Sequence, residues 1–191
     1  IEDVLRVEGI GHEFVHRVPA GTHLGIPIVT SDGNNRIIGV PRASNEVTAE
    51  RVSAARDVLT RARLLLVQSQ VPLPAIHAAV RRVGPETTVV WNPAPARFGL
   101  EDMFPKGAVG SVAWISPNES EVSGLTGIEV TDPASAVRAA TAIVSRYPLA
   151  GVVVTLGCQG AVAVDATGSQ FHCAAFDVEA KKYNVYPLDS S

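Results

Sequence analysis

Four short polar groups each follow an apolar segment of the chain, and their residue types could support binding or catalysis. They are Gln68-Ser69-Gln70, Asn92-Pro93-Ala94-Pro95-Ala96, Pro117-Asn118-Glu119-Ser120-Glu121 and Thr155-Leu156-Gly157-Cys158-Gln159-Gly160. Amides and hydroxyls can bond to the hydroxyl groups of a small polar molecule. A carboxylate can act on a phosphate through Mg²⁺ and its waters. Each group alone also suits an ordinary turn, so their combination carries more weight than any one of them.

The third group places an amide and a carboxylate at the start of a predicted helix. Asn118 and Glu121 stand three residues apart and share one helical face, where they could serve a phosphate through Mg²⁺. The same residues also fit a plain helix start, in which Asn118 caps the helix and the glutamates favour its dipole. The residues by themselves leave both interpretations open.

The fourth group holds paired glycines after a buried strand. Gly157 and Gly160 allow a tight turn and close backbone approach, which suits a nucleotide base or phosphate. The group is not a P-loop, because no Gly-x-x-x-x-Gly-Lys-Ser/Thr occurs in the chain. The five histidines form no ligand-spaced set, so a metal–histidine site is not expected. We expect Cys158 and Cys173 to be small buried side chains rather than a disulfide or a metal pair.

The elements that must position these groups alternate between strand and helix. Strands are predicted at 24–30, 36–40, 64–68, 87–91, 111–115, 151–156, 161–164 and 170–174. Helices are predicted at 48–61, 73–83, 119–125 and from 133 onward. Repeated strand–helix units with unalternating apolar strands indicate an α/β layer fold with helices on both sides of a parallel sheet. In such sheets ligands bind beyond the carboxyl ends of the strands, where the four groups lie.

Composition excludes several classes of protein. The 191 residues suffice for one domain, and 46% hydrophobic with 18% charged residues favours a globular chain. A net charge of −3 gives no electrostatic basis for binding nucleic acid or an anionic membrane. The apolar stretch at 149–156 is half of what a bilayer span needs and no secretory leader opens the chain, so we expect a soluble cytoplasmic protein. The chain begins with Ile1 and its only methionine is Met103, which suggests that processing or truncation removed a beginning.

The order and separation of the motifs resemble one family. Asn92-Pro-Ala-Pro-Ala-Arg97, Pro117-Asn118-Glu119-Ser120-Glu121 with Leu125-Thr126-Gly127, and Val154-Thr155-Leu156-Gly157-x-x-Gly160 before a hairpin resemble the ribokinase-like carbohydrate kinases, or phosphofructokinase-B (PfkB) family. The resemblance spans residues 21–180, including the hairpin at 24–40. It implies a three-layer α/β/α fold with a mostly parallel sheet and β-hairpin elements.

The resemblance also implies an activity and its site. Members transfer the γ-phosphoryl group of ATP to a sugar hydroxyl, here ribose to ribose 5-phosphate, with Mg²⁺ and commonly a monovalent cation such as K⁺, and a homodimer is possible. Asn118 and Glu121 would order Mg²⁺, water and phosphate oxygens, with Glu121 reaching the metal through water. The nucleotide loop would consist of Thr155, Leu156, Gly157, Cys158, Gln159 and Gly160. Gln70 stands where the family usually carries a sugar-binding glutamate, so hydrogen bonding is kept but a charge is removed.

Two departures from the family pattern shape the expected activity. The sugar-binding Gly-Gly and Asn motifs are absent upstream, and the segment Asp-Thr-x-Gly-Ala-Gly-Asp, with the anion hole and catalytic base, does not follow Ala180. Residues 181–191 instead form an unrelated tail. We therefore expect one partial domain over 1–191, truncated at both ends and inactive alone. The alternatives are a non-catalytic nucleotide- or partner-binding remnant, or a related sugar or nucleoside kinase.

Overall fold

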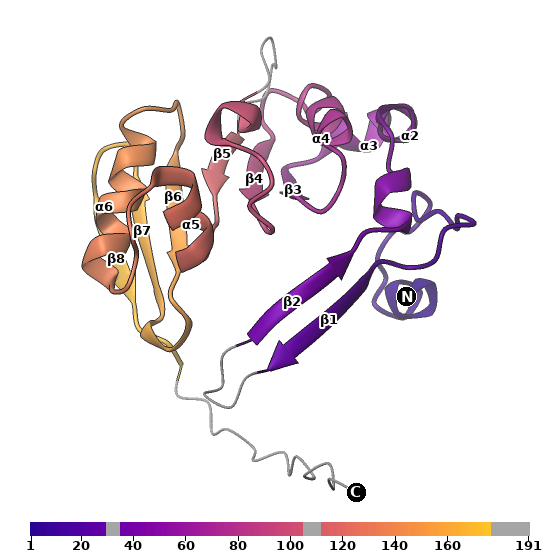
Figure 1. Cartoon of the computed structure of the whole chain (residues 1–191). Coiled ribbons are helices and arrows are strands. Elements are labelled where there is room, and N and C mark those ends of the chain that lie inside the picture. The colour runs from indigo at the N-terminus through magenta and orange to yellow at the C-terminus, as the bar shows by residue number, and fades with distance from the viewer. Residues whose placement is uncertain (30–34, 105–111, 177–191) are drawn as a thin grey trace, which may run out of the picture.

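The chain forms a six-stranded sheet with helices against it and a separate two-stranded hairpin (Figure 1). The computed structural model describes residues 1–29, 35–104 and 112–176. The sheet consists of β3 (Leu64–Gln68), β4 (Thr88–Asn92), β5 (Val112–Ile115), β6 (Gly151–Thr155), β7 (Ala161–Asp165) and β8 (Gln170–Cys173), in that spatial order. β3 to β6 pair in parallel, whereas β7 and β8 add in antiparallel. The predicted α/β class with a mostly parallel sheet is confirmed.

The helices α5 (Glu119–Thr126) and α6 (Pro133–Val144) begin at residues that cap helices well, Asn118 and Asp132. The carboxylate of Asp132 accepts the backbone N–H of Ser135 at 2.7 Å at the start of α6, and α5 ends at Gly127 with φ 73°. The α-helices are α1 (Glu2–Val7), α2 (Ala49–Ala54), α3 (Arg56–Arg61), α4 (Leu73–Val80), α5 (Glu119–Thr126) and α6 (Pro133–Val144). Short 3-10 helices lie at Ala43–Glu46, Leu100–Met103 and Gly157–Gln159. None of the helices in the described part of the chain has the length and apolar character that a membrane span requires.

The single helix predicted over 48–61 is wrong in one respect, because the structure divides it into α2 and α3. Thr48 caps α2 as its sequence position suggests, with its hydroxyl oxygen accepting the N–H of Arg51 at 3.3 Å. The break falls at Ala55 (φ −87°, ψ 14°). Just before it, the Ser53 hydroxyl donates to the carbonyl of Ala49 at 2.6 Å, a contact of the kind that bends helices. The apolar periodicity is continuous, so it gave no sign of the break.

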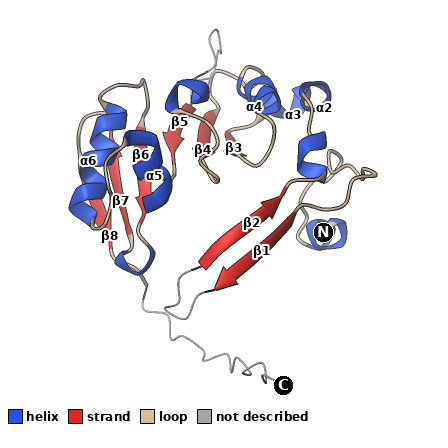
Figure 2. Ribbon diagram, viewed as in Figure 1, coloured by secondary structure: helices blue, strands red, loops and turns tan. Residues whose placement is uncertain are grey.

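The hydrophobic core lies on one face of the sheet. Val89, Trp91, Ile115, Val152 and Val154 are all fully buried there. They cluster with side chains of three helices, namely Ile76 and Val80 of α4, Val122 of α5, and Ala136, Ala139, Ala140 and Ile143 of α6. Figure 2 shows α5 and α6 lying over β6 and β7, in agreement with their contacts. One layer of helices therefore holds the described part of the sheet in place.

The opposite face of the sheet is apolar and open. Leu64 and Leu66 of β3 are 53% and 69% exposed, and Phe171 of β8 is 61% exposed. Between these outer strands, Trp114 is half-buried and its ring lies over Gly151, where an added Cβ would overlap it. Among the described residues, the helices whose side chains enter the core all lie on the other face, so this part of the chain supplies one of the two expected helical layers.

The hairpin of β1 (Leu24–Val29) and β2 (Asn35–Val40) stands apart from the sheet, as Figure 1 shows. Its antiparallel register pairs Leu24 with Val40, which confirms the predicted hairpin. Residues 31–34 of the predicted connecting loop lie outside the described residues. Large apolar side chains of the hairpin are exposed, among them Ile26, Ile28 and Ile37.

Candidate functional site

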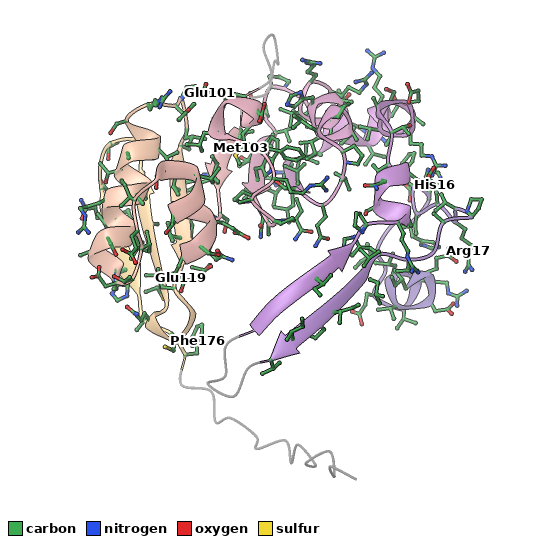
Figure 3. The ribbon with its side chains drawn as sticks, in the orientation of Figure 1. His16, Arg17, Glu101, Met103, Glu119 and Phe176 are labelled. Carbon is green, nitrogen blue, oxygen red and sulfur yellow. The ribbon has the colours of Figure 1, made fainter. Side chains whose placement is uncertain are left out.

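The polar groups singled out in the sequence lie at one edge of the sheet. β3, β4, β5 and β6 run parallel, so their carboxyl ends share that edge. β7 reverses direction and β8 reverses it again, so the end of β8 lies there too. Figure 3 labels Glu119, which starts α5, and Phe176, which follows β8, at this edge. The fold thus gathers segments that are more than a hundred residues apart along the chain.

Asn118 and Glu121 form a reciprocal hydrogen-bonded pair at the start of α5. The side-chain oxygen of Asn118 accepts the backbone N–H of Glu121 at 2.9 Å, and the Glu121 carboxylate accepts the backbone N–H of Asn118 at 2.9 Å. This capping box satisfies two N–H groups that the helix cannot bond internally. The helix-start interpretation of these residues is therefore confirmed. It fixes both side chains at the positive end of the α5 dipole.

The start of α5 lies directly beside the end of β6. The backbone N–H of Thr155 donates to the carbonyl of Pro117 at 3.0 Å, and Asn118 and Thr155 form a parallel β-bridge. Thr155 is exposed at the strand end. Two motifs that the sequence separates by more than thirty residues are therefore neighbours, as the shared edge of a parallel sheet requires.

The turn after β6 depends on glycine. Gly157 has φ 50° and Gly160 has φ 88°, in the region that disfavours other residues. The Leu156 N–H donates to the Gly160 carbonyl at 2.8 Å, which closes the turn. A Cβ added at Gly160 would overlap the carbonyl oxygen of Cys173 in β8. The second glycine is thus required by both its backbone angle and the close approach of β8.

A cavity of about 820 Å³ opens at this turn. Its wall consists of Gly157, Cys158, Gly160, Ala161, Cys173, Ala174, Ala175 and Phe176. Three of the six predicted loop residues, Gly157, Cys158 and Gly160, line the cavity. Leu156 is buried, and the side-chain amide of Gln159 donates to the carbonyl of Thr131 at 3.3 Å. The contribution of the end of β8 to the site was not predicted from the sequence. Only the antiparallel register, which places Cys173 opposite Ala161, brings it to the cavity.

The prediction of buried cysteines is wrong. Cys158 and Cys173 are both free and exposed. The apolar segments around them suggested burial. Cys158 instead lies in the 3-10 helix at the turn, and Cys173 ends β8 on the open face of the sheet. The Cys173 thiol makes only a long contact of 3.6 Å to the carbonyl of Ala174.

Glu119 is a second carboxylate at the site that sequence reasoning passed over. It opens α5, and its Oε1 lies 3.8 Å from the place where a Cβ would stand on Gly157. The Glu119 side chain thus lies beside the glycine turn. Its position directly after Asn118 was the available signal, but the same feature also fits an ordinary acidic first turn.

Gln70 lies at the same edge of the sheet, but beside β3, which is the outermost of the four parallel strands and the farthest from β6. It follows β3, where the Ser69 N–H donates to the Asn92 carbonyl at 3.2 Å and the Trp91 indole donates to the Ser69 hydroxyl at 3.0 Å. Three strand spacings separate β3 from β6, or about 14 Å. Gln70 is therefore not brought into contact with the glycine turn. Two small molecules, or the two ends of one longer ligand, could occupy the two positions.

Comparison with known proteins decides the family. The model of the pfkB family carbohydrate kinases matches residues 1–182. The chain belongs to this family. The match begins earlier than residue 21, where the resemblance in the motifs starts, and it includes the hairpin and the segments on both sides of it.

Relatives of this pfkB chain carry sugar kinase names. A mouse ribokinase is 33% identical over 162 residues, which cover 83% of this chain and 48% of the relative. A deoxyribokinase of Salmonella typhi is 29% identical and covers 90% of this chain and 55% of its own length. The ribokinase of Thermotoga maritima has the same fold, with a TM-score of 0.72 at 25% identity, over 93% of this chain and 56% of that one.

A further solved relative shows a nucleotide complex. The ribokinase of Cryptococcus neoformans, solved in complex with ADP, matches 93% of this chain and 58% of its own with a TM-score of 0.71 at 22% identity, which shows a shared fold. This pfkB chain spans about half the length of the curated relatives it matches.

The carboxylates at the start of α5 fit a Mg²⁺ ion whose other ligands are phosphate oxygens and waters. In the described ranges, no three His, Cys, Asp or Glu side chains gather closely enough to hold a metal ion. Mg²⁺ commonly keeps several waters and takes one or two carboxylates together with phosphate oxygens. Glu119 and Glu121 supply carboxylates of that kind. The Oε2 of Glu121 accepts the Asn118 N–H at 2.9 Å, which leaves the other carboxylate oxygen, Oε1, outside the capping box.

Proposed function

We propose that this chain carries the nucleotide-binding part of an ATP-dependent sugar kinase, which transfers the γ-phosphoryl group of ATP to a hydroxyl of ribose or a close relative of ribose. The observation that supports this most is the junction of the α5 start with the glycine turn, where Asn118 pairs with Thr155. The relatives named ribokinase and deoxyribokinase support the choice of a pentose.

The site would bind ATP with its phosphates toward α5. A helix N-terminus attracts anions because its free N–H groups and its dipole both favour negative charge. Because the turn has no side chains at its glycines, a nucleoside could approach the backbone there. It would lie in the cavity lined by residues from Gly157 to Phe176. Bound Mg²⁺ would neutralise phosphate charge during transfer. Glu121 and Glu119 would hold the waters of that ion, and the capping box would keep Glu121 in a single orientation.

The sugar would lie near the end of β3. Gln70 is half-buried in the turn after this strand, where its amide can donate and accept hydrogen bonds to sugar hydroxyls. Its distance from the glycine turn leaves room for the phosphates between sugar and nucleoside. A monovalent cation such as K⁺ and a homodimer stay predictions from the family resemblance.

Phosphoryl transfer also needs a base and an anion hole, which the family resemblance assigns to a Gly-Ala-Gly-Asp segment. That segment does not occur among the 191 residues. Losing both groups would cost several powers of ten in rate. The 191 residues alone are therefore expected to bind Mg-ATP without phosphorylating sugar. The alternative, a non-catalytic nucleotide-binding remnant, would behave in the same way.

A coupled ADP-release assay with Mg-ATP and ribose tests the predicted inactivity of the 191 residues, with deoxyribose and a nucleoside as competing acceptors. We expect no release above the ATPase background from the 191 residues. Turnover at ordinary kinase rates, about 1–100 s⁻¹, would contradict the predicted inactivity. Turnover with a nucleoside in place of the sugars would contradict the proposed acceptor.

A further inference from the structure

The two cysteines lie at one cavity, and nothing in the proposed phosphoryl transfer uses their thiols. Cys158 and Cys173 are both exposed and both line the cavity of about 820 Å³ at the glycine turn. They come from different elements, fifteen positions apart in the chain. In the described part of the chain they are the free cysteines, so every described cysteine lines the same space.

A side-chain hydrogen bond and the close approach of two backbone segments hold the cysteine segments together. The His172 ring nitrogen Nε2 lies 3.0 Å from the carbonyl of Gln159, which joins β8 to the 3-10 helix that carries Cys158. Gly160 approaches Cys173 so closely that an added Cβ would overlap the Cys173 carbonyl oxygen. Both cysteines therefore stay in the wall of the cavity, and we expect a group attached to either sulfur to reach this space.

The chemistry available to an exposed thiol is exchange with a disulfide. The cysteine loses its proton to solvent, and the thiolate attacks one sulfur of a small disulfide such as oxidised glutathione. The S–S bond of the reagent breaks, a protein–glutathione disulfide forms, and one glutathione leaves as the thiolate. No further oxidant is needed, because the reagent disulfide is reduced as the mixed disulfide forms. Access is one of the requirements for this exchange, and both cysteines are exposed.

We propose that Cys158 and Cys173 are a thiol modification site, at which a mixed disulfide with a small thiol fills the cavity and excludes the nucleotide. This inference rests on the proposed function, since it assigns the cavity to ATP. Modification and nucleotide binding are then mutually exclusive. Bound Mg-ATP should protect the thiols, and reduction of the mixed disulfide should restore binding.

The test compares thiol variants of the full chain. The wild type, Cys158→Ser, Cys173→Ser and the double variant are treated with oxidised glutathione, and the adducts are counted by intact mass. Mg-ATP affinity is then measured by calorimetry before treatment, after treatment, and after dithiothreitol. A matched control carries Ser145→Cys in the double-variant background, because Ser145 is an exposed residue at the far end of α6.

We expect adducts on the wild type and on both single variants, none on the double variant, and at least a tenfold loss of Mg-ATP affinity wherever Cys158 or Cys173 is modified. The Ser145→Cys control should take an adduct and keep its affinity. Thiols that resist modification, or adducts that leave affinity unchanged, would overturn the inference. A reduced wild type that binds no Mg-ATP would instead contradict the proposed function and the exclusion of nucleotide, while the adduct count would still decide whether these thiols are modified.

Discussion

Asn118 and Glu121 show how one pair of side chains can serve both the fold and a ligand. Their reciprocal bonds use one oxygen of each side chain to start α5. The sequence left the cap and the phosphate site as alternatives. The structure makes them compatible, because the cap fixes the Glu121 carboxylate where the helix dipole and the neighbouring Thr155 loop would favour a bound phosphate.

Asn118→Ala tests this double role. Losing the cap should lower the free energy of unfolding by about 1 kcal/mol, and losing the orientation of Glu121 should weaken Mg-ATP binding at least tenfold. Chemical denaturation gives the first quantity and calorimetry gives the second. Asn118→Asp, which keeps the capping oxygen, should recover most of the stability.

The chain provides a matched control in its second capping box. Asp132 starts α6 as Asn118 starts α5, but it is Asn118 that forms the β-bridge to Thr155 at the end of β6. Asp132→Ala should destabilise α6 and leave Mg-ATP affinity within about twofold, since the capping bond is local. If both alanine variants weakened nucleotide binding equally, the effect would be one of stability and the role proposed for Asn118 would fail.

The pH dependence of stability should carry a contribution from Asp132. Hydrogen bonds from the backbone N–H and hydroxyl of Ser135 lower the pKa of its carboxyl group below the ordinary value of 3.8. A lowered pKa in the folded state stabilises the fold above the unfolded-state pKa, and that contribution is lost as the pH falls through the folded-state pKa. In Asp132→Asn, the free energy of unfolding should therefore depend less on pH below about pH 4, and its dependence on pH near pH 7 should hardly change. Urea midpoints measured from pH 2 to 7 would show this.

At the scale of elements, the sequence predicted all eight of the described strands in their order along the chain. Apolar runs identified β3 and β6 because both are short and bounded by turn residues, and the Asp165–Gly168 turn identified the hairpin of β7 and β8. The break at Ala55 could not be predicted, since the apolar pattern continues through it without interruption. The exposure of Cys158 and Cys173 also could not, because segment hydrophobicity does not say whether a facing layer is present.

The candidate site was predicted in pieces but not as an assembly. Asn118, Glu121 and the glycines could be named because their types suit phosphate and tight turns. The approach of Cys173 to Gly160 depends on how β8 pairs with β7, which follows from tertiary register and not from any local pattern.

Gly160→Ala should disrupt the turn and the cavity together. The added methyl group meets the Cys173 carbonyl, and the backbone angle of Gly160 is left-handed. Gly168→Ala is the matched control, with φ 84° and nothing within 4 Å of the added Cβ. We expect Gly168→Ala to cost about 1 kcal/mol from backbone strain, and Gly160→Ala to cost more and to abolish Mg-ATP binding. Equal losses in both variants would argue against the close approach of β8.

At the scale of the whole molecule, the open apolar face of the sheet is the dominant feature. Parallel sheets usually bury both faces. Here Leu66 and Phe171 are exposed on a face without helices in the described ranges, and the chain spans about half the length of its curated relatives. An apolar surface of this kind favours association with other chains. The isolated chain should therefore bind hydrophobic dyes and self-associate.

Variants of two adjacent leucines in β3 can distinguish a contribution of the open face from a contribution of the core. Leu66 is 69% exposed on the open face, whereas Leu65 packs against the core from the opposite face. Leu66→Ala should change the free energy of unfolding by less than about 0.5 kcal/mol and reduce self-association in sedimentation experiments. Leu65→Ala should cost about 2 kcal/mol and leave association unimproved. A loss of stability in Leu66→Ala as large as that in Leu65→Ala would show that a further layer covers this face.

The central claim is that nucleotide binds where the start of α5 meets the glycine turn. Backbone amide NMR of the reduced chain titrated with Mg-ATP tests it most directly. We predict saturable shifts at Asn118 to Glu121 and at Gly157 to Gly160, with Asp132 and Gly168 unchanged. Spectra that do not change at millimolar Mg-ATP, or shifts that lie elsewhere in the chain, would contradict the account.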